Sequence, residues 1–133
     1  MVEILQGKDP VAETIAYLSP FYPEAVFGLD VPAEWEWGPL LIVVTDVGGP
    51  GPRDVVLDDA YISVLVSHED SENASDIART ILGLLRQWPM ANRAVYWNRV
   101  MQRPTYAPDE DTKVPAYSMT VALTFRASKK IVD

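Results

Sequence analysis

A chain of 133 residues can bury one hydrophobic core, and the absence of cysteine excludes a disulfide framework, a thiolate metal site and a cysteine nucleophile. A net charge of −8 argues against general binding to nucleic-acid phosphates, which requires an excess of Lys and Arg. No secretory pattern follows Met1, and no apolar stretch approaches the roughly 20 residues of a membrane helix. We therefore expect one soluble domain over residues 1–133, folded in a reducing compartment.

The charge is unevenly distributed between the two halves of the chain. Residues 1–67 carry a net charge of −9, whereas residues 68–133 carry +1. Two interpretations stay open. The acids keep the protein soluble, or the more basic second half meets an acidic partner.

The first half predicts one helix followed by three strands. Asp9 is a suitable cap and Pro10 suits a first turn, so we expect a helix over residues 8–19 that ends at Pro20. A glycine- and proline-rich run at residues 48–52 predicts a turn that no regular element crosses. The expected strands are residues 25–29, 40–45 and 56–67.

The second half predicts one long helix and two strands. An apolar stripe indicates a helix over residues 74–88 that Pro89 closes. The expected strands are residues 94–102 and 117–126, with a polar loop at 103–113 between them and a frayed end at 129–133. The sequence thus predicts an α+β fold in the order α-β-β-β-α-β-β. Its mainly antiparallel sheet has about five strands, with both helices packed on one face.

The residues do not indicate an enzyme, a cofactor or a metal site. The single histidine, His68, lies beside acids at the expected entry to the second helix, where acids favour the positive end of the helix dipole. Asp58 and Asp59 are adjacent in a strand, so they point to opposite faces and cannot share a proton. The Gly48–Pro52 run lacks the Lys-Ser/Thr and the helix of a phosphate-binding loop.

Two aromatic-rich segments predict surfaces. Glu34 and Glu36 flank Trp35, with Trp37 close by, which leaves a small carbohydrate-binding or hydrolytic module open. We favour the interpretation that the two tryptophans cover the core or a neighbouring subunit. The second segment favours a protein–protein surface rather than a nucleic-acid surface. It consists of Arg93, Tyr96, Trp97, Arg99, Arg103 and Tyr106, together with Arg126.

Residues 77–85 (IARTILGLL), 95–100 (VYWNRV) and 115–126 (PAYSMTVALTFR), separated by an acidic, proline-containing loop, resemble the tail terminator proteins of long-tailed bacteriophages. The resemblance covers most of the chain and lies in the layout of its elements. It implies a structural virion subunit without enzymatic activity or cofactor. Such subunits form a ring, usually a hexamer, that caps the tail tube, ends its polymerisation and joins the head.

The implied partners are other copies of the chain, the major tail tube protein and a head–tail connector or neck protein. DNA would pass through the lumen without specific binding, no membrane is involved, and the location would be the head-proximal end of the tail, after assembly in the host cytoplasm. Alternatives are a head-completion (neck) protein and a regulator of a bacterial secretion or toxin system. Contacts between two different surfaces of neighbouring subunits close such a ring. An acidic lining of its channel would let DNA slide through without sticking.

The candidate channel-lining acids are Glu34, Glu36, Asp46, Asp54, Asp58 and Asp59. The expected loops at residues 46–54 and 103–113 are candidate contacts with the tube or the neighbouring subunit. The candidate subunit or tube contacts are Arg93, Arg99, Arg103, Tyr106, Asp109, Glu110 and Asp111.

Overall fold

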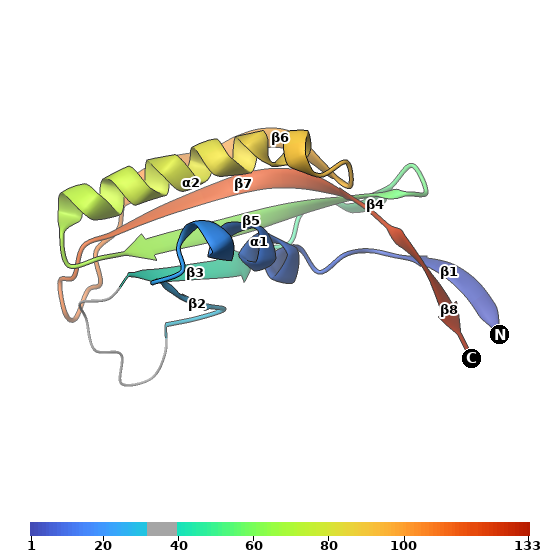
Figure 1. Ribbon diagram of the computed structural model, residues 1–133, viewed down its shortest axis with the longest axis horizontal. Coiled ribbons are helices and arrows are strands. Elements are labelled where there is room, and N and C mark those ends of the chain that lie inside the picture. The colour runs from blue at the N-terminus through green and yellow to red at the C-terminus, as the bar shows by residue number, and fades with distance from the viewer. Residues whose placement is uncertain (32–39) are drawn as a thin grey trace.

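The fold is α+β, with two helices and a mixed, mostly antiparallel sheet of six strands, as a computed structural model describes it for residues 1–31 and 40–133 (Figure 1). The strands are β1 (Val2–Gln6), β2 (Val26–Gly28), β3 (Leu41–Asp46), β4 (Gly51–Arg53), β5 (Leu57–Ser67), β6 (Val95–Tyr106), β7 (Ala116–Arg126) and β8 (Ser128–Val132). The helices are α1 (Pro10–Leu18) and α2 (Ser71–Ala91), and a 3-10 turn, η1 (Ser19–Phe21), follows α1.

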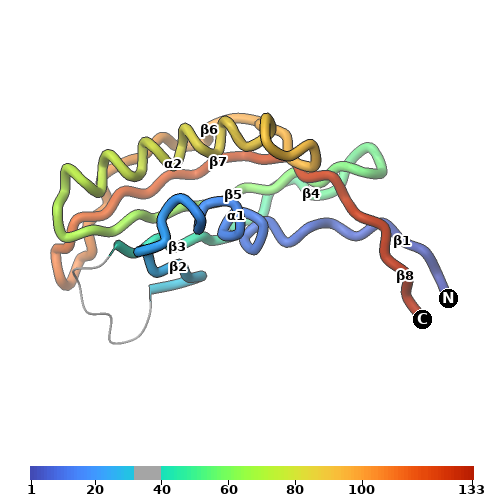
Figure 2. Tube along the Cα trace, viewed as in Figure 1, coloured from blue at the N-terminus to red at the C-terminus, as the bar shows by residue number. Residues whose placement is uncertain are grey.

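The main sheet has the strand order β2-β3-β5-β7-β6. Among the strands of this sheet that the structure describes, β2 and β3 run parallel and every other pair is antiparallel. The short β4 pairs with residues 57–59 of β5, next to the stretch of β5 that pairs with β3. A second, two-stranded sheet of β1 and β8 leaves the body of the molecule at one end (Figure 2).

Local capping explains where both helices begin. The Asp9 carboxylate accepts hydrogen bonds from the backbone N–H groups of Val11 and Ala12 at the start of α1. At the start of α2, the Asp70 carboxylate accepts them from the N–H groups of Glu72 and Asn73. The first helix agrees with its prediction. The second begins three residues early, at Ser71, and continues past Pro89 to Ala91, because a proline in the last turn removes only one backbone donor.

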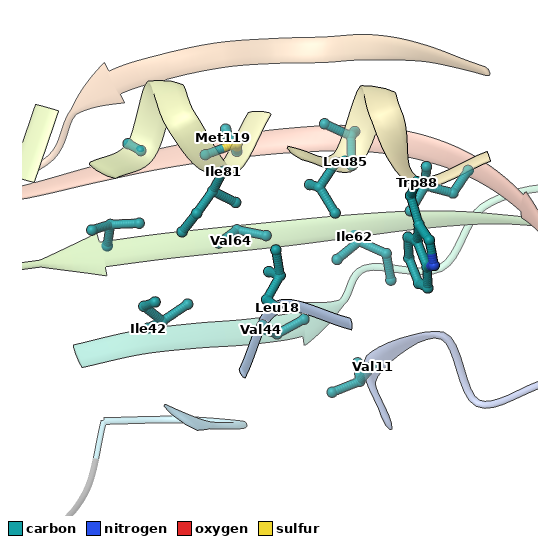
Figure 3. Close-up of a cluster of buried hydrophobic side chains, with 14 of the residues drawn as sticks. Val11, Leu18, Ile42, Val44, Ile62, Val64, Ile81, Leu85, Trp88 and Met119 are labelled. Atoms are coloured by element: carbon teal, nitrogen blue, oxygen red, sulfur yellow. The ribbon is translucent and has the colours of Figure 1, made fainter. Parts of the chain in front are cut away.

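Both helices cover the same face of the sheet, where the core lies (Figure 3). Alternate residues of β5, from Ala60 to Val66, point into this core, as the alternation in the sequence predicts. The α1 helix contributes Val11 and Leu18, while α2 contributes a stripe that ends at Trp88. None of the helices in the two described ranges is long and apolar enough to cross a membrane.

The sequence-based prediction misses three strands and shortens another. The order of the other elements agrees, but β1, β4 and β8 are additional, and the expected frayed end is wrong because residues 128–132 pair with β1. Within the Gly48–Pro52 run, β4 begins at Gly51. The β6 strand continues through Pro104 to Tyr106, into the expected loop, since a strand at the edge of a sheet tolerates a residue without an N–H.

Candidate assembly surfaces

The β1 and β8 strands form an exposed, two-stranded arm. Its register runs from Val2 opposite Val132 to Gln6 opposite Ser128, so the two chain ends lie together at the tip (Figure 1). All ten strand residues are exposed. An isolated two-stranded ribbon is marginally stable in water, so an arm of this kind gains stability when another surface covers it.

The two faces of the arm differ in charge. One face carries the exposed apolar residues Val2, Ile4 and Val132, together with Lys130. On the other face, Ile131 and Leu5 lie beside an ion pair between Lys129 and Glu3, whose nitrogen and oxygen are 3.7 Å apart. Lys130, unlike Lys129, has no ion-pair partner within the described ranges.

The base of the arm is attached to the body by polar contacts. The Lys8 ammonium donates to the Ser128 hydroxyl at 2.9 Å, and the backbone N–H of Ala127 donates to the Val56 carbonyl at 2.7 Å. The backbone at Gly7 runs so close to Asp58 that a Cβ there would lie 2.8 Å from a carboxylate oxygen. The direction of the arm is therefore set at its base.

A groove of about 630 Å³ lies between α1 and the end of β3. We call it the α1–β3 groove. Its polar lining is confined to Asp9, Thr45 and Asp46. The rest of its wall is apolar and consists of Val11, Ala12, Ile15, Ala16, Leu29 and Val44. Leu29 is 67% exposed, so the groove offers apolar surface to a partner.

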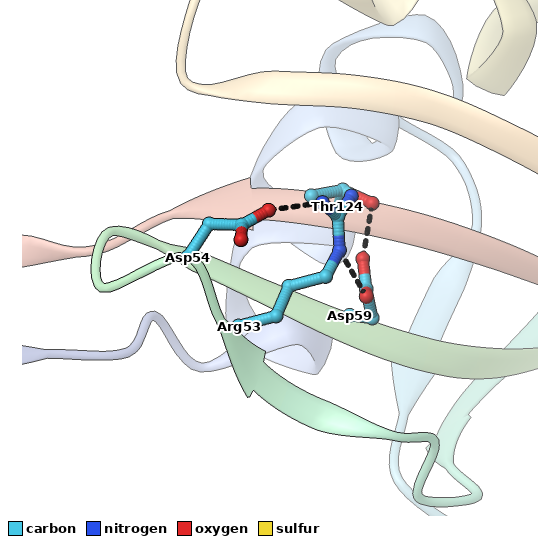
Figure 4. Close-up of polar contacts among 4 residues, drawn as sticks. All are labelled: Arg53, Asp54, Asp59 and Thr124. Atoms are coloured by element: carbon cyan, nitrogen blue, oxygen red, sulfur yellow. Dashed lines mark hydrogen bonds and ion pairs between the residues drawn. The ribbon is translucent and has the colours of Figure 1, made fainter.

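A polar network fastens β4 to the sheet (Figure 4). The Asp59 carboxylate, 8% exposed, accepts a hydrogen bond from Arg53 Nε at 2.5 Å and another from Thr124 Oγ1 at 2.6 Å. These two donors, Arg53 first, lower the pKa of Asp59. Next to it, burial raises the pKa of Asp58, and the negative charges of Asp59 and Asp46 raise it further.

We expect Asp59→Ala to reduce the free energy of unfolding at pH 7 by about 1–2 kcal/mol, because Thr124 loses its buried acceptor while the half-exposed Arg53 stays hydrated. The pKa of Asp59 is lower in the folded state than in the unfolded state. The ionised carboxylate therefore stabilises the fold at pH values above the unfolded-state pKa, and this stabilisation is lost as the pH falls through the folded-state pKa. Urea unfolding at pH 7 and pH 3 should therefore show a smaller difference between wild type and variant at pH 3. Asp54→Asn is the control, because it weakens only the exposed ion pair of Arg53 with Asp54 and leaves the bonds to Asp59 in place. Equal effects of the two substitutions would contradict the role of Asp59.

The four candidate channel-lining acids that the structure describes do not all lie on one face of the sheet. Glu34 and Glu36 lie outside the described residues, as do Trp35 and Trp37. Asp46 and Asp54 are exposed, at the end of β3 and after β4. Asp58 and Asp59 point to opposite faces of β5, and the charge of Asp59 is compensated by Arg53 within the subunit. The lining therefore stays a prediction. Asp46 and Asp54 are its exposed members, and Asp54 pairs with Arg53 at 3.0 Å.

The candidate contact residues gather along β6 and its two flanking turns. Arg93 is exposed before β6, and Arg99 and Arg103 are exposed on this edge strand. Tyr106 is 51% exposed, and its ring centroid lies 5.4 Å from that of Tyr117. Glu110 and Asp111 are exposed in the turn between β6 and β7. Within this turn, the Asp109 carboxylate accepts hydrogen bonds from the backbone and hydroxyl of Thr112, which lower its pKa, so Asp109 also holds the turn together.

The structure places His68 where the sequence predicts, at the entry to α2. Its Nδ1 accepts a hydrogen bond from the backbone N–H of Asp70, the cap of that helix. Among residues 1–31 and 40–133, no group of three or more His, Cys, Asp and Glu side chains is placed to hold a metal ion. His68 thus has a local structural role.

Sequence reasoning missed the arm and the α1–β3 groove. The signal for the arm was present as β-branched and apolar residues at both chain ends, but neither end contains a turn that joins it to the other. The groove depends on Leu29 and α1 meeting the end of β3, which no local pattern specifies. No protein-family model and no curated protein matches this chain.

Proposed function

We propose that this protein is a structural subunit that assembles with copies of itself into a ring at the head-proximal end of a long-tailed phage tail. There the ring would cap the tail tube, end its polymerisation and join the head. The observation that carries this proposal is the arm, whose ten strand residues are all exposed although half of them are apolar. A surface of this kind favours protein–protein contact.

The charges of the chain support an assembly role over a nucleic-acid-binding role. Stable contact with DNA phosphates needs an excess of basic residues, whereas the net charge here is −8. An exposed acid such as Asp46 would repel a passing duplex if it faced a lumen. The basic residues of the second half then remain for contacts with acidic surfaces of neighbouring subunits.

The ends of the chain also favour head-to-tail contact. An arm at one end of an elongated subunit (Figure 2) joins a different surface on the next copy, and such heterologous contacts close into a ring or continue as a filament. The resemblance to tail terminators favours the ring, with six subunits. The same geometry serves a head-completion protein, so the partner decides between the two functions.

The test combines the purified full-length chain with tail tubes assembled from the major tube protein encoded in the same genome. We expect closed rings by electron microscopy, a uniform oligomer mass by light scattering, and rings at one end of each tube whose length no longer increases. Binding to the head–tail connector instead of the tube would favour the neck function. A chain that stays monomeric and leaves tube growth unchanged would contradict the proposal.

A further inference from the structure

We propose that the arm of one copy occupies the α1–β3 groove of the next copy, inserting the face that carries Ile4, Lys130 and Val132. This inference rests on the ring-forming function proposed above and names the contact that would close the ring. Both surfaces belong to the same chain, so a head-to-tail contact between copies uses each of them once.

The chemistry of the two surfaces is complementary. The groove has an apolar wall and carries carboxylates from Asp9 and Asp46. The inserting face of the arm has apolar residues beside Lys130, which has no ion-pair partner in the described parts of the chain. Apolar side chains can therefore fill the groove while an ammonium group meets carboxylates, which favours one orientation of the arm.

The acidic surroundings of the groove strengthen this match. Burial and the charge of Asp59 raise the pKa of Asp58, and the nearby charge of Asp46 adds to this, so Asp46 and Asp58 lie close together at this end of the body. A lysine from another copy would relieve the repulsion between these two carboxylates. The opposite face of the arm is a poorer match, because Lys129 on that face is already paired with Glu3.

The arm of the same copy does not reach the groove in this structure. Five strand residues at about 3.3 Å each carry the tip roughly 17 Å from the base. Figure 1 shows the arm pointing away from both helices, and the contacts of Lys8 and Ala127 set this direction. A second copy is therefore the occupant that the geometry favours.

Two single substitutions test the contact from its two sides. Ile4→Asp places a charge on the inserting face, and Ala12→Arg places a long cation in the groove at an exposed position of α1. We expect each variant to associate at least tenfold more weakly than wild type. The aspartate introduced at position 4 would pair with Lys130 opposite it and would repel the groove carboxylates, whereas the arginine introduced at position 12 would fill the groove, engage those carboxylates and repel Lys130. Light scattering over a concentration series measures this.

The two variants mixed in equal amounts give the sharpest result. The Ala12→Arg copy keeps an intact arm, and the Ile4→Asp copy keeps an intact groove. We therefore expect the mixture to associate at least tenfold more tightly than either variant alone, through the intact arm and the intact groove, which also shows that both variants are folded. No association in the mixture would overturn the proposal. Arm-to-arm pairing predicts instead that Ala12→Arg associates like wild type.

Two matched controls introduce the same new residues, Asp and Arg, at positions outside the proposed contact. Ile131→Asp lies on the opposite face of the arm, and Gln87→Arg adds a cation at an exposed position of α2. We expect both controls to associate within about threefold of wild type, which corresponds to about 0.65 kcal/mol or less at 25 °C. If wild-type rings form and both test variants form them equally well, the arm–groove contact is wrong while the ring-forming function stands. If wild type forms no oligomer, both fail.

A cross-link gives an independent readout because the chain contains no native cysteine. Copies with Ala12→Cys are mixed with copies with Val132→Cys and oxidised gently, so that a disulfide between the two positions must join different copies. We expect the 12–132 heterodimer, identified by mass spectrometry, to exceed the product formed with Gln87→Cys copies. Equal yields from the two pairs would overturn the proposal.

Discussion

Phe125→Ala is expected to remove about 3–5 kcal/mol of stability, the largest effect among the substitutions considered for this protein. Phe125 is fully buried in β7 and packs edge-on against Trp88 of α2, with ring centroids 5.8 Å apart. Trp88 in turn stacks on Tyr17 of α1 at 4.6 Å, so the aromatic group joins the sheet to both helices. Truncation leaves a cavity at this junction.

For a chain of this length, the loss corresponds to a fall in Tm of roughly 10–20 °C. Differential scanning calorimetry and urea unfolding would measure it. Phe21→Ala is a matched control, since Phe21 also contacts Tyr17 but is 51% exposed. We expect this control to cost less than about 1 kcal/mol. Similar losses from both substitutions would show that the aromatic group does not anchor the core.

Gly49→Ala is the second substitution with a large expected effect, about 2–4 kcal/mol, because it combines an unfavourable backbone angle with a collision. Gly49 has a φ of +113°, and a Cβ there would lie 2.9 Å from the Asp59 carbonyl oxygen and 3.0 Å from the Tyr61 nitrogen. Both atoms belong to the backbone of β5, which cannot move without disturbing the sheet. Equilibrium unfolding in urea measures the loss.

Gly48→Ala separates the two causes. Gly48 has a φ of +95°, but a Cβ there would meet nothing within 4 Å. We therefore expect only the cost of the backbone angle, about 1–2 kcal/mol. If Gly48→Ala destabilises the protein as much as Gly49→Ala does, the close approach to β5 contributes nothing measurable.

The helices and the central strands could be predicted from the sequence because their signals are local. Asp9 and Asp70 cap the helices through bonds to residues two and three positions ahead, and the alternation in β5 follows from the period of a strand. These patterns act within a few residues. They are therefore readable without knowledge of the rest of the chain.

The candidate surfaces were only partly predictable. The basic and aromatic residues in the range 93–106 predicted a protein–protein surface, and the structure places them on and beside the edge strand β6. Asp59, in contrast, was a candidate channel-lining acid, whereas Arg53 and Thr124 donate hydrogen bonds to its carboxylate within the subunit. Thr124 is 65 positions away in the chain, so only the pairing of β5 with β7 brings the donor to this acid.

By itself, the sequence determined the two helices and the strands that face the core, because hydrophobic period and capping chemistry are properties of short segments. Only the tertiary structure decided that the two chain ends pair as an arm, that β4 joins the sheet within a glycine- and proline-rich turn, and that α1 forms a groove with β3. Each of these features joins segments whose contact depends on how the whole chain packs. Their stabilising energy arises from that contact, so it leaves little trace in the local pattern of either segment.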